Sequence, residues 1–303
     1  MNYIREKSQY VFNRGNLKMI ALFCMTLDHF AVMILDSWLK ILEKESLEFF
    51  CVNTLHIMLR LIGRIAFPIF CFFIVEGLLH TRNVYKYALR LLILGIISEV
   101  PFDMVLKHTF FDRHNQNVFW TLLLGLITIY AIDGIYKKVR CQKAIRYIII
   151  TATALSGMYL AEYFGTDYGC IGVLTIVVIY LIGREEYVLS VVINVIGQAY
   201  KVSTYERDKN FIVVLVIYIL LIITFSTVIY FCKKVNNINS KKMLAGCAAL
   251  SCLNPIEMAA LVNVRLFAGY NGEKGKNIGW LFYFYYPLHL AALAGLCMLV
   301  KLY

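Results

Sequence analysis

The sequence predicts an all-α polytopic membrane protein, with about ten transmembrane helices around a polar cavity inside the membrane. Composition is the first observation: 60% of the 303 residues are apolar and 16% are charged, whereas soluble domains average about 25% charged residues. The second is that the apolar residues form long runs, and the third is that several runs carry ionisable residues. This composition argues against a soluble α/β enzyme or a nucleic-acid binder. Most of the Lys and Arg residues that give the net charge of +11 lie between the apolar runs. They therefore indicate the orientation of the chain in the membrane and not a nucleic-acid partner.

The apolar runs are each close to the length of about 20 residues that a helix needs to cross a bilayer. The sixth and seventh runs are short, and Pro255 and Glu257 interrupt the ninth, so the count could be nine or could include a re-entrant piece. No linker is long enough to separate two domains, so residues 1–303 are expected to form one membrane domain. The expected spans are residues 17–35, 55–79, 84–106, 117–136, 144–164, 168–183, 187–202, 211–232, 243–266 and 278–300.

Lys and Arg residues set the expected orientation, because cytoplasmic loops carry an excess of them. With the N-terminus inside, the inner segments hold most of these residues, and the acidic loop from Glu43 to Glu48 falls outside. We therefore expect both termini in the cytoplasm and a multi-pass protein of the cell membrane.

Cysteines and the N-terminus carry little functional signal. The nine cysteines include no CxxC pair and no Cys/His cluster with metal spacing, so we expect neither disulfides nor a metal site. The first residues lack an apolar core followed by a cleavage site, so they do not predict a signal peptide.

Ionisable and amide residues gather at one depth in the first four spans. Such a group costs roughly 2.5–3.5 kcal/mol at the bilayer centre on insertion scales, so this grouping favours a functional polar cavity. Members four positions apart on one helix share a face. The alternative is a structural ion network in which the arginines neutralise the acids of the third span. The residues are Asp28 and His29 in the first span, Arg60 and Arg64 in the second, Glu99 and Asp103 in the third, and Asn115 and Asn117 at the start of the fourth.

Lys18 and His29 lie on nearly the same stripe of the first span, because eleven residues make close to three helical turns. They are roughly 16 Å apart along the axis, comparable to an extended phosphopantetheine arm. Lys18 at the cytoplasmic mouth can meet a phosphate, and His29 can do proton chemistry. Alternatively, Lys18 is a positive-inside anchor and His29 a satisfied core residue.

Several sequence blocks, in order, resemble the TraX family of membrane proteins. They are LKMIALFCMTLDHF (17–30), LRLIGRIAFPIFCFFIVEGLLHTRNVYKYALRLLILGIISEVPFD (59–103), HNQNVFWTLLLG (114–125), TDYGCIGVL (166–174), YNGEKGK (270–276) and YFYYPLHL (283–290). That family is associated with N-terminal acetylation of conjugative pilin. It is similar to the membrane acyltransferase-3 superfamily, which moves acetyl groups from cytoplasmic acetyl-CoA to acceptors across the membrane. That superfamily has a basic residue, ten residues and then a histidine, which Lys18 and His29 match, and paired arginines, which Arg60 and Arg64 match.

The resemblance implies an acyl-CoA-dependent O- or N-acetyltransferase with acetyl-CoA as co-substrate and no metal. His29 would act as general base or transient acetyl carrier, with Asp28 or Glu99 orienting its ring and Asp103 as a further candidate. Arg60 or Arg64 would stabilise the thioester oxyanion. The chain is longer than expected for the pilin-acetylating members, so the acceptor is not carried over. The residues expected to hold the phosphates of the coenzyme are Lys18, Arg82 and Arg90.

Further polar residues have two interpretations each. Asn117 and Thr121 bind substrate or join the third and fourth spans, and His289 lines the cavity opposite His29 or hydrogen-bonds a neighbouring span. Tyr286 is a further substrate-binding candidate beside Pro287.

The sequence also predicts local features of the chain. The residues Asp167, Tyr168 and Gly169 predict an outer turn, and Pro68, after Phe67, predicts a kink in the second span. The outer loops 36–54, 107–116 and 270–276 are expected to supply acceptor specificity.

The expected partners are acetyl-CoA, the lipid bilayer and an extracytoplasmic acceptor, which is a peptide, a glycan or a small molecule, and not nucleic acid. A proton-coupled transporter is the second function class, because chains of intramembrane Asp, Glu, His and Arg can relay protons. The sequence lacks the paired repeats and broken helices in both halves that many transporters have. A membrane scaffold without chemistry is the third class.

Overall fold

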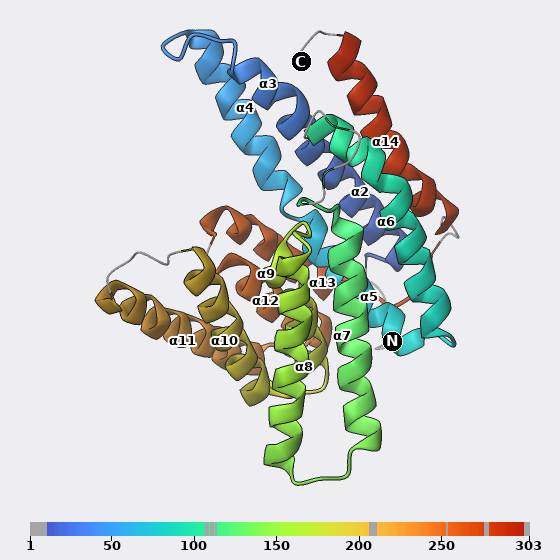
Figure 1. The fold of residues 1–303 in the computed structure, drawn as a ribbon, viewed down its shortest axis with the longest axis vertical. Helices are drawn as coiled ribbons and strands as arrows, with labels where there is room; N and C mark the ends of the chain where they lie inside the picture. Colours follow the sequence, from blue (N-terminus) through green and yellow to red (C-terminus); the bar gives the residue numbers. More distant parts are fainter. Residues whose placement is uncertain are drawn as a thin grey trace, which may run out of the picture.

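The computed structural model describes residues 11–106, 109, 112, 114–205, 211–252, 254–275 and 279–299. Within these ranges the regular elements are helices, and two isolated β-bridges stand in place of strands, which confirms the predicted all-α class for this part of the chain (Figure 1). In chain order the elements are α2 (Arg14–Phe30), η1 (Ala31–Leu35, a π-helix), α3 (Asp36–Leu39), α4 (Leu47–Gly63), α5 (Ala66–His80), α6 (Val84–Leu106), α7 (Val118–Lys138), α8 (Lys143–Tyr163), α9 (Gly169–Gly183), α10 (Tyr187–Tyr205), α11 (Phe211–Lys234), α12 (Ile238–Ser251), η2 (Pro255–Leu261, a 3-10 helix), α13 (Val262–Ala268) and α14 (Gly279–Leu299).

Helices of membrane-spanning length are present. Among the described residues, four helical stretches are long and apolar enough to cross a bilayer: Arg14–Leu39, Leu47–His80, Val118–Lys138 and Lys143–Tyr163. Gly169–Gly183 and Phe284–Cys297 are shorter apolar helices. This is fewer than the ten spans expected. The length and the apolar composition of these helices are those of a helical membrane protein.

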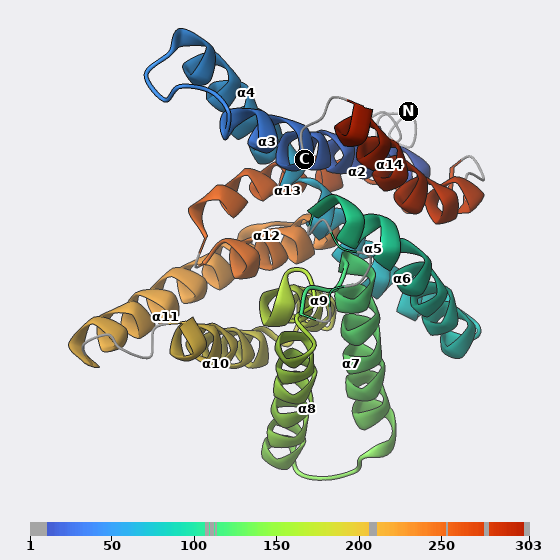
Figure 2. The same cartoon turned by 45° about the horizontal axis from the view of Figure 1, so that its top comes forward.

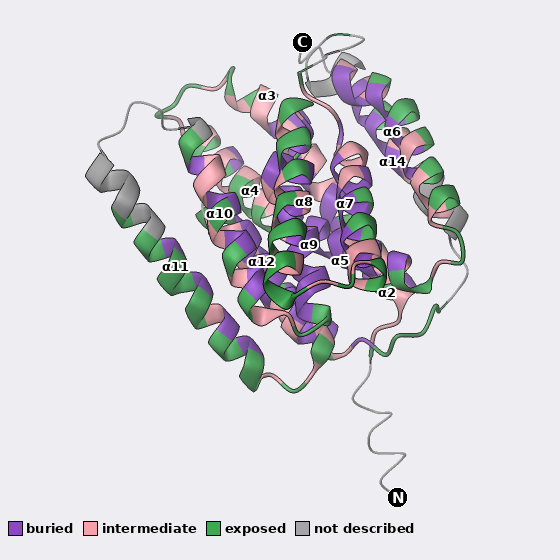
Figure 3. Cartoon of the chain, turned by 60° about the horizontal axis from the view of Figure 1, so that its bottom comes forward, coloured by how far each residue is buried: buried purple, intermediate pink, exposed green. Residues whose placement is uncertain are grey.

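Helix α9 forms the centre of the bundle. It is apolar around its whole circumference, and a helix of that kind must be covered on all sides. Its side chains are almost all buried, and it packs against α5, α7, α8, α10 and α12 (Figure 3). By contrast, α11 lies at one edge of the bundle (Figure 3).

The second expected span is two helices, α4 and α5, with a break at Arg64 and Ile65. Proline has no N–H, so Pro68 cannot donate to the carbonyl of Arg64, and the helical ladder ends there. The predicted kink is thus confirmed, four residues before the proline. Helix α4 also begins earlier than expected, at Leu47, because the Ser46 side chain accepts a hydrogen bond from the N–H of Phe49 (3.0 Å) and caps it.

The ninth expected span is a re-entrant hairpin of α12, η2 and α13. Asn237, which caps the start of α12, donates to the carbonyl of Ala268 at the end of α13 (3.4 Å), so the hairpin begins and ends at one level. Asn254 and Pro255 start η2 at the tip. This hairpin favours the re-entrant alternative over a single crossing helix, and the physical reason is the proline, which has no N–H to continue the hydrogen bonds of α12.

Helices α2 and α14 run in the same direction. Thr26 Oγ1 lies 2.6 Å from the hydroxyl of Tyr285, and Cys297 Sγ lies 3.7 Å from the carbonyl oxygen of Met33, so residue numbers rise together along both helices. The start of α2 and the end of α14 therefore lie at opposite ends of the bundle (Figure 1), and the two helices lie side by side (Figure 2). The prediction that both termini lie on one side is therefore not confirmed, because the hairpin in place of the ninth span begins and ends at one level.

The segment 270–275 also lies elsewhere than predicted. Phe12 pairs with Tyr270, and the N–H of Arg14 donates to the carbonyl of Glu273 (2.9 Å), which places this segment at the start of α2. We call that end of the bundle the inner end, following the predicted orientation, and the opposite end the outer end. Segment 270–275 is therefore not an outer loop. Of the predicted loop 107–116, residues 107, 108, 110, 111 and 113 lie outside the described residues.

Candidate functional site

A cavity of about 350 Å³ lies where α2, α4, α5, η2 and α14 meet the turn before α9. Apolar side chains from α2, α5 and α6 form part of its wall. The rest of the wall is polar, and most of it is charged, which is unusual inside an apolar bundle. We call this space the central cavity. Its polar lining residues are Asp28, His29, Arg60, Arg64, Asp167, Tyr168, Glu257 and Tyr286.

Arg64 joins two carboxylates on the wall of the central cavity. Its Nη2 donates to both oxygens of Asp28 (2.7 Å each), and its Nη1 donates to Glu257 Oε1 (2.8 Å). Arg60 Nη1 donates to Asp28 Oδ2 (2.7 Å). Asp28, Arg64 and Glu257 are at most 9% exposed, so their charges are compensated mainly by each other. The arginines pair with Asp28 and Glu257, and the alternative pairing with Glu99 and Asp103 is wrong.

Gly63 allows α4 to lie against Asp28. A Cβ at this position would lie 2.2 Å from Asp28 Oδ1 and 2.3 Å from Asp28 Cβ, so more than the end of a flexible side chain would have to move. Gly63→Ala is therefore expected to displace Asp28 and to destabilise the protein by about 1–3 kcal/mol. The measurement is thermal unfolding of the purified protein in detergent.

Gly134→Ala is the matched control, because nothing lies within 4 Å of a Cβ at that position in α7. It should leave the stability unchanged or raise it by up to about 1 kcal/mol, since alanine favours a helix over glycine. Equal stability of Gly63→Ala and the wild type would contradict the tight contact with Asp28.

His29 stands at the point where α2 changes from an α-helix to a π-helix, which begins at Ala31. Such single π-turns are frequent at functional sites. His29 Nδ1 lies 2.7 Å from His289 Nε2, and His289 Nδ1 lies 2.9 Å from the carbonyl oxygen of Tyr285. The partner of the His29 ring is thus His289. The expectation that Asp28 or Glu99 orients the ring is corrected, because Asp28 is engaged by the arginines.

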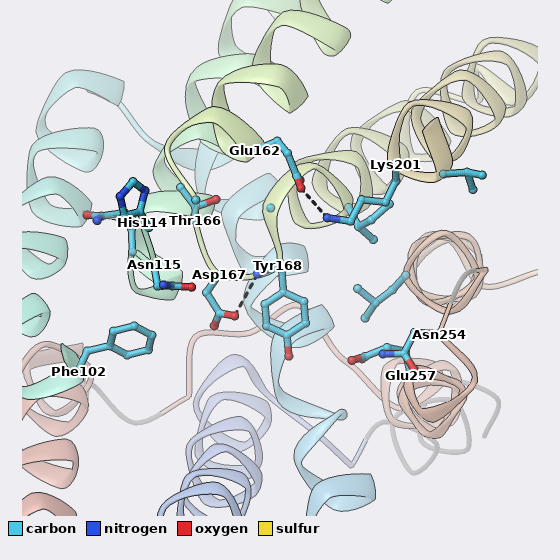
Figure 4. Close-up of a pocket in the computed structure, with 16 residues that line it drawn as sticks. Phe102, His114, Asn115, Glu162, Thr166, Asp167, Tyr168, Lys201, Asn254 and Glu257 are labelled. Atoms are coloured by element: carbon cyan, nitrogen blue, oxygen red, sulfur yellow. Dashed lines mark hydrogen bonds and ion pairs between the residues drawn. The ribbon is translucent and has the colours of Figure 1, made fainter. Parts of the chain in front are cut away.

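A larger pocket of about 950 Å³ adjoins the central cavity on the outer side. Both spaces are lined by Phe102, Asp167, Tyr168 and Glu257, which form the partition between them. In Figure 4, Asp167 and Tyr168 lie between His114 and Asn115 on one side and Asn254 and Glu257 on the other. We call this space the outer pocket. It is large enough to hold an organic molecule beside the central cavity.

Charged and polar groups also line the outer pocket. Lys201 Nζ donates to Glu162 Oε1 (2.7 Å), as the dashed line in Figure 4 marks. Burial raises the pKa of the Asp167 carboxyl to about 6, although Arg64 acts in the opposite direction. Glu257 Oε2 is buried without a hydrogen-bond partner in the described part of the chain. The partition between the two spaces is therefore acidic.

Four residues predicted for the site line neither the central cavity nor the outer pocket. They connect neighbouring parts of the chain instead. Asn117 caps α7 and donates to Glu99 Oε2 (2.5 Å), which also accepts from the Trp120 indole N–H (2.7 Å). Asp103 accepts from the N–H of Asp112 (2.7 Å), and the Thr121 hydroxyl donates to the carbonyl of Asp167. For Asn117 the structure thus favours the alternative interpretation, in which it joins the third and fourth spans, α6 and α7. Thr121 instead joins α7 to the turn before α9.

The residues predicted to hold the coenzyme phosphates lie at the inner end. Lys18 Nζ is 5.4 Å from the centre of the Phe73 ring, and Arg82 and Arg90 are exposed. None of the three is among the residues that line the central cavity or the outer pocket.

Sequence reasoning missed Glu257 and Gly63 and treated Asp167 and Tyr168 only as a turn. Glu257 had a signal, since it is an acid beside a proline inside an apolar run. His289 was expected either opposite His29 in the cavity or bonded to a neighbouring span, and Tyr286 was a candidate for substrate binding. Tyr286 lines the central cavity, and His289 forms the hydrogen bond to a neighbouring helix that was the other possibility.

The model of the family described as TraX protein matches residues 13–239, which is more than half of the chain. The chain belongs to the TraX family. The match includes Asp28, His29, Arg60, Arg64 and Asp167 and ends before Glu257 and His289. No solved structure matches this TraX-family chain.

A curated protein is similar to part of the chain. The chain is 31% identical over 157 residues to the probable fimbrial assembly protein FimC, serogroup H1, of Dichelobacter nodosus. The alignment covers 49% of this chain and 56% of that protein, so the chain spans about half the length of the curated relative it matches.

Proposed function

We propose that this TraX-family protein is a multi-pass membrane acetyltransferase. It transfers an acetyl group from cytoplasmic acetyl-CoA to an amine or hydroxyl acceptor that is reached from the extracytoplasmic side. The observation that carries this proposal is the placement of His29, Arg60 and Arg64 on one central cavity that adjoins the outer pocket. Acyl transfer needs a base and cations placed together on one cavity, and His29, Arg60 and Arg64 provide them.

The reaction follows from these groups. The acceptor nitrogen or oxygen attacks the thioester carbonyl carbon, and His29 accepts the proton that the acceptor loses. The C–S bond then breaks, and His29 returns the proton to the coenzyme A thiolate. In the covalent variant, His29 attacks the thioester carbonyl and expels the coenzyme A thiolate. The acceptor then attacks the acetyl-imidazole, the bond from carbon to the ring nitrogen breaks, and the acceptor proton passes through the freed ring to the thiolate. Arg60 and Arg64 line the cavity and can stabilise the oxyanion, an effect worth about 2.7–4 kcal/mol per donor in other enzymes.

The donor enters from the inner end in this proposal. Lys18 lies near the start of α2 and His29 near its end, on a single helix, so the helix can align a phosphate and a thioester in one extended molecule. The Lys18 ammonium now packs over Phe73. Binding of the coenzyme phosphates would draw Lys18 off this ring.

The acceptor enters through the outer pocket in this proposal. The pocket is large enough for the end of a peptide, and its partition with the central cavity is acidic. The name of the Dichelobacter nodosus relative refers to fimbrial assembly, which favours a peptide acceptor. His114, Asn115 and Asn254 would then contact the acceptor.

Release of coenzyme A tests the proposal. Purified protein in lipid nanodiscs with acetyl-CoA should release free thiol slowly alone, and at least about tenfold faster with short peptides as acceptors. The reasoning is that a bound, oriented nucleophile reacts far faster than water. Mass spectrometry of the peptide should show the added acetyl group. No thiol release with any acceptor, together with proton movement across proteoliposomes, would favour the transporter class instead.

A further inference from the structure

We infer that His289 is the positioning residue of this site, holding His29 in the tautomer whose Nδ1 is protonated and whose Nε2 is left for reaction. The inference rests on the proposed function, and it goes further because it names the reacting atom and the group that selects it.

The two imidazole rings form one aligned pair. Their planes differ by 3°, their centres are 5.0 Å apart, and His29 Nδ1 lies 2.7 Å from His289 Nε2. For parallel rings, these two lengths fit together only when the rings share a plane and the hydrogen bond lies on the line between their centres. This is the geometry in which a ring N–H points at the lone pair of the other ring.

The direction of that hydrogen bond follows from Tyr285. Its carbonyl oxygen can only accept, so His289 Nδ1, at 2.9 Å, must carry a proton. A neutral imidazole has one N–H, so Nε2 of a neutral His289 has a lone pair and accepts from His29. His289 is buried at 8% exposure, which favours this neutral form. His29 Nδ1 therefore donates.

The remaining nitrogen of His29 is then available to the cavity. His29 lines the central cavity, whereas His289 is not among its lining residues. Arg60 and Arg64 line the same space, and their positive charges oppose a second proton on His29. With Nδ1 occupied, Nε2 is the atom that accepts the acceptor proton or the acetyl group. When it does so, the Nδ1–H bond to His289 strengthens and steadies the charge that forms on the His29 ring.

Neighbouring contacts hold His289 in place. Its ring is nearly parallel to that of Tyr285, and the Tyr285 hydroxyl lies 2.6 Å from Thr26 Oγ1 on α2. Tyr286 contacts the rings of His29 and His289 edge-on. The pair is therefore fixed from both helices, which is what a positioning group requires.

Nitrogen NMR of the wild-type protein tests the inference without a change in the pair. The protein is labelled with ¹⁵N-histidine, and the His29→Ala spectrum identifies the His29 signals by their absence. We expect protonated Nδ1 and unprotonated Nε2 for His29. A proton on Nε2 of His29 would overturn the inference. This readout is independent of acetyl transfer, so it separates failure of the inference from failure of the proposed function.

Two variants of His289 test the consequence for catalysis. His289→Leu removes the acceptor of the His29 proton, and kcat should fall about 100-fold, the lower end of the range for acid–base groups, with KM for acetyl-CoA unchanged within about twofold. His289→Gln offers an amide oxygen as acceptor, so its kcat should be at least about tenfold higher than that of His289→Leu.

Equal losses in the two variants, or an unchanged kcat in His289→Leu, would overturn the inference. If His289→Leu does not fold, His289→Gln and the NMR spectrum decide. His289→Gln would then have to keep Nδ1 of His29 protonated and keep kcat within about tenfold of the wild type, since an amide oxygen replaces the lost acceptor.

Discussion

His29→Ala abolishes acetyl transfer if the central cavity is the active site. The imidazole is the nitrogen base on the cavity wall, and its Nε2 can take up the acceptor proton and return it to the leaving thiolate. Loss of a general base or a nucleophile lowers kcat by about 10²–10⁴-fold, which would bring coenzyme A release close to background. The measurement is thiol release from acetyl-CoA by purified protein in nanodiscs, with and without a peptide acceptor.

The control for this variant is His56→Ala. His56 lies in α4, outside the lining of both spaces, and its ring is 3.8 Å from Asp36. His56→Ala should keep the wild-type rate, and both variants should show the wild-type elution volume and unfolding temperature. A folded His29→Ala protein that transfers acetyl at the wild-type rate would remove the proposed mechanism.

Arg64→Met is expected to cause a large loss of stability. Arg64 is the hydrogen-bond partner of Glu257 and the main partner of Asp28, and all three side chains are buried. Removal of one member of a buried ion pair costs about 3–5 kcal/mol, because the other charge stays in the interior without compensation. Asp28 retains Arg60, but Glu257 retains no ion-pair partner in the described part of the chain. The free energy of unfolding in detergent measures the loss.

Two comparison variants locate the cause. Arg60→Met should lose much less stability, because the Arg60 side chain is 31% exposed and Asp28 keeps Arg64. The double variant Arg64→Met with Glu257→Gln should be more stable than Arg64→Met alone, since it removes the stranded charge. Equal stability of Arg64→Met and the wild type would show that the ion network does not hold α2, α4 and η2 together.

The sequence predicted those parts of the site that lie close together along one helix. The eleven-residue interval from Lys18 to His29, and the four-residue interval from Arg60 to Arg64, predicted which side chains share a helix face. Both arginines do line the cavity beside His29. The Pro255 break in the ninth run likewise predicted the re-entrant alternative, because proline has no N–H with which to continue the hydrogen bonds of a helix.

The partners of these residues could not be predicted, because they come from distant parts of the chain. Arg64 and Glu257 are separated by 193 positions, and His29 and His289 by 260. Helical periodicity links only residues that lie close together on one helix, so no spacing in the sequence predicts either pair. The first pair depends on where the tip of the hairpin, η2, meets the break between α4 and α5. The second pair depends on the direction of α14 relative to α2. The positive-inside count assumed that the ninth run crosses, and this assumption placed residues 270–275 at the outer end instead of beside the start of α2.

A structure with coenzyme A bound tests the central claim most directly. Cryo-electron microscopy of the protein in nanodiscs would place the phosphates and the sulfur relative to α2. The account predicts phosphates at Lys18 and a thiol sulfur within about 4 Å of His29 Nε2, a separation at which an attack can begin. A coenzyme whose sulfur ends far from the central cavity, with no path between that cavity and the inner end, would contradict it.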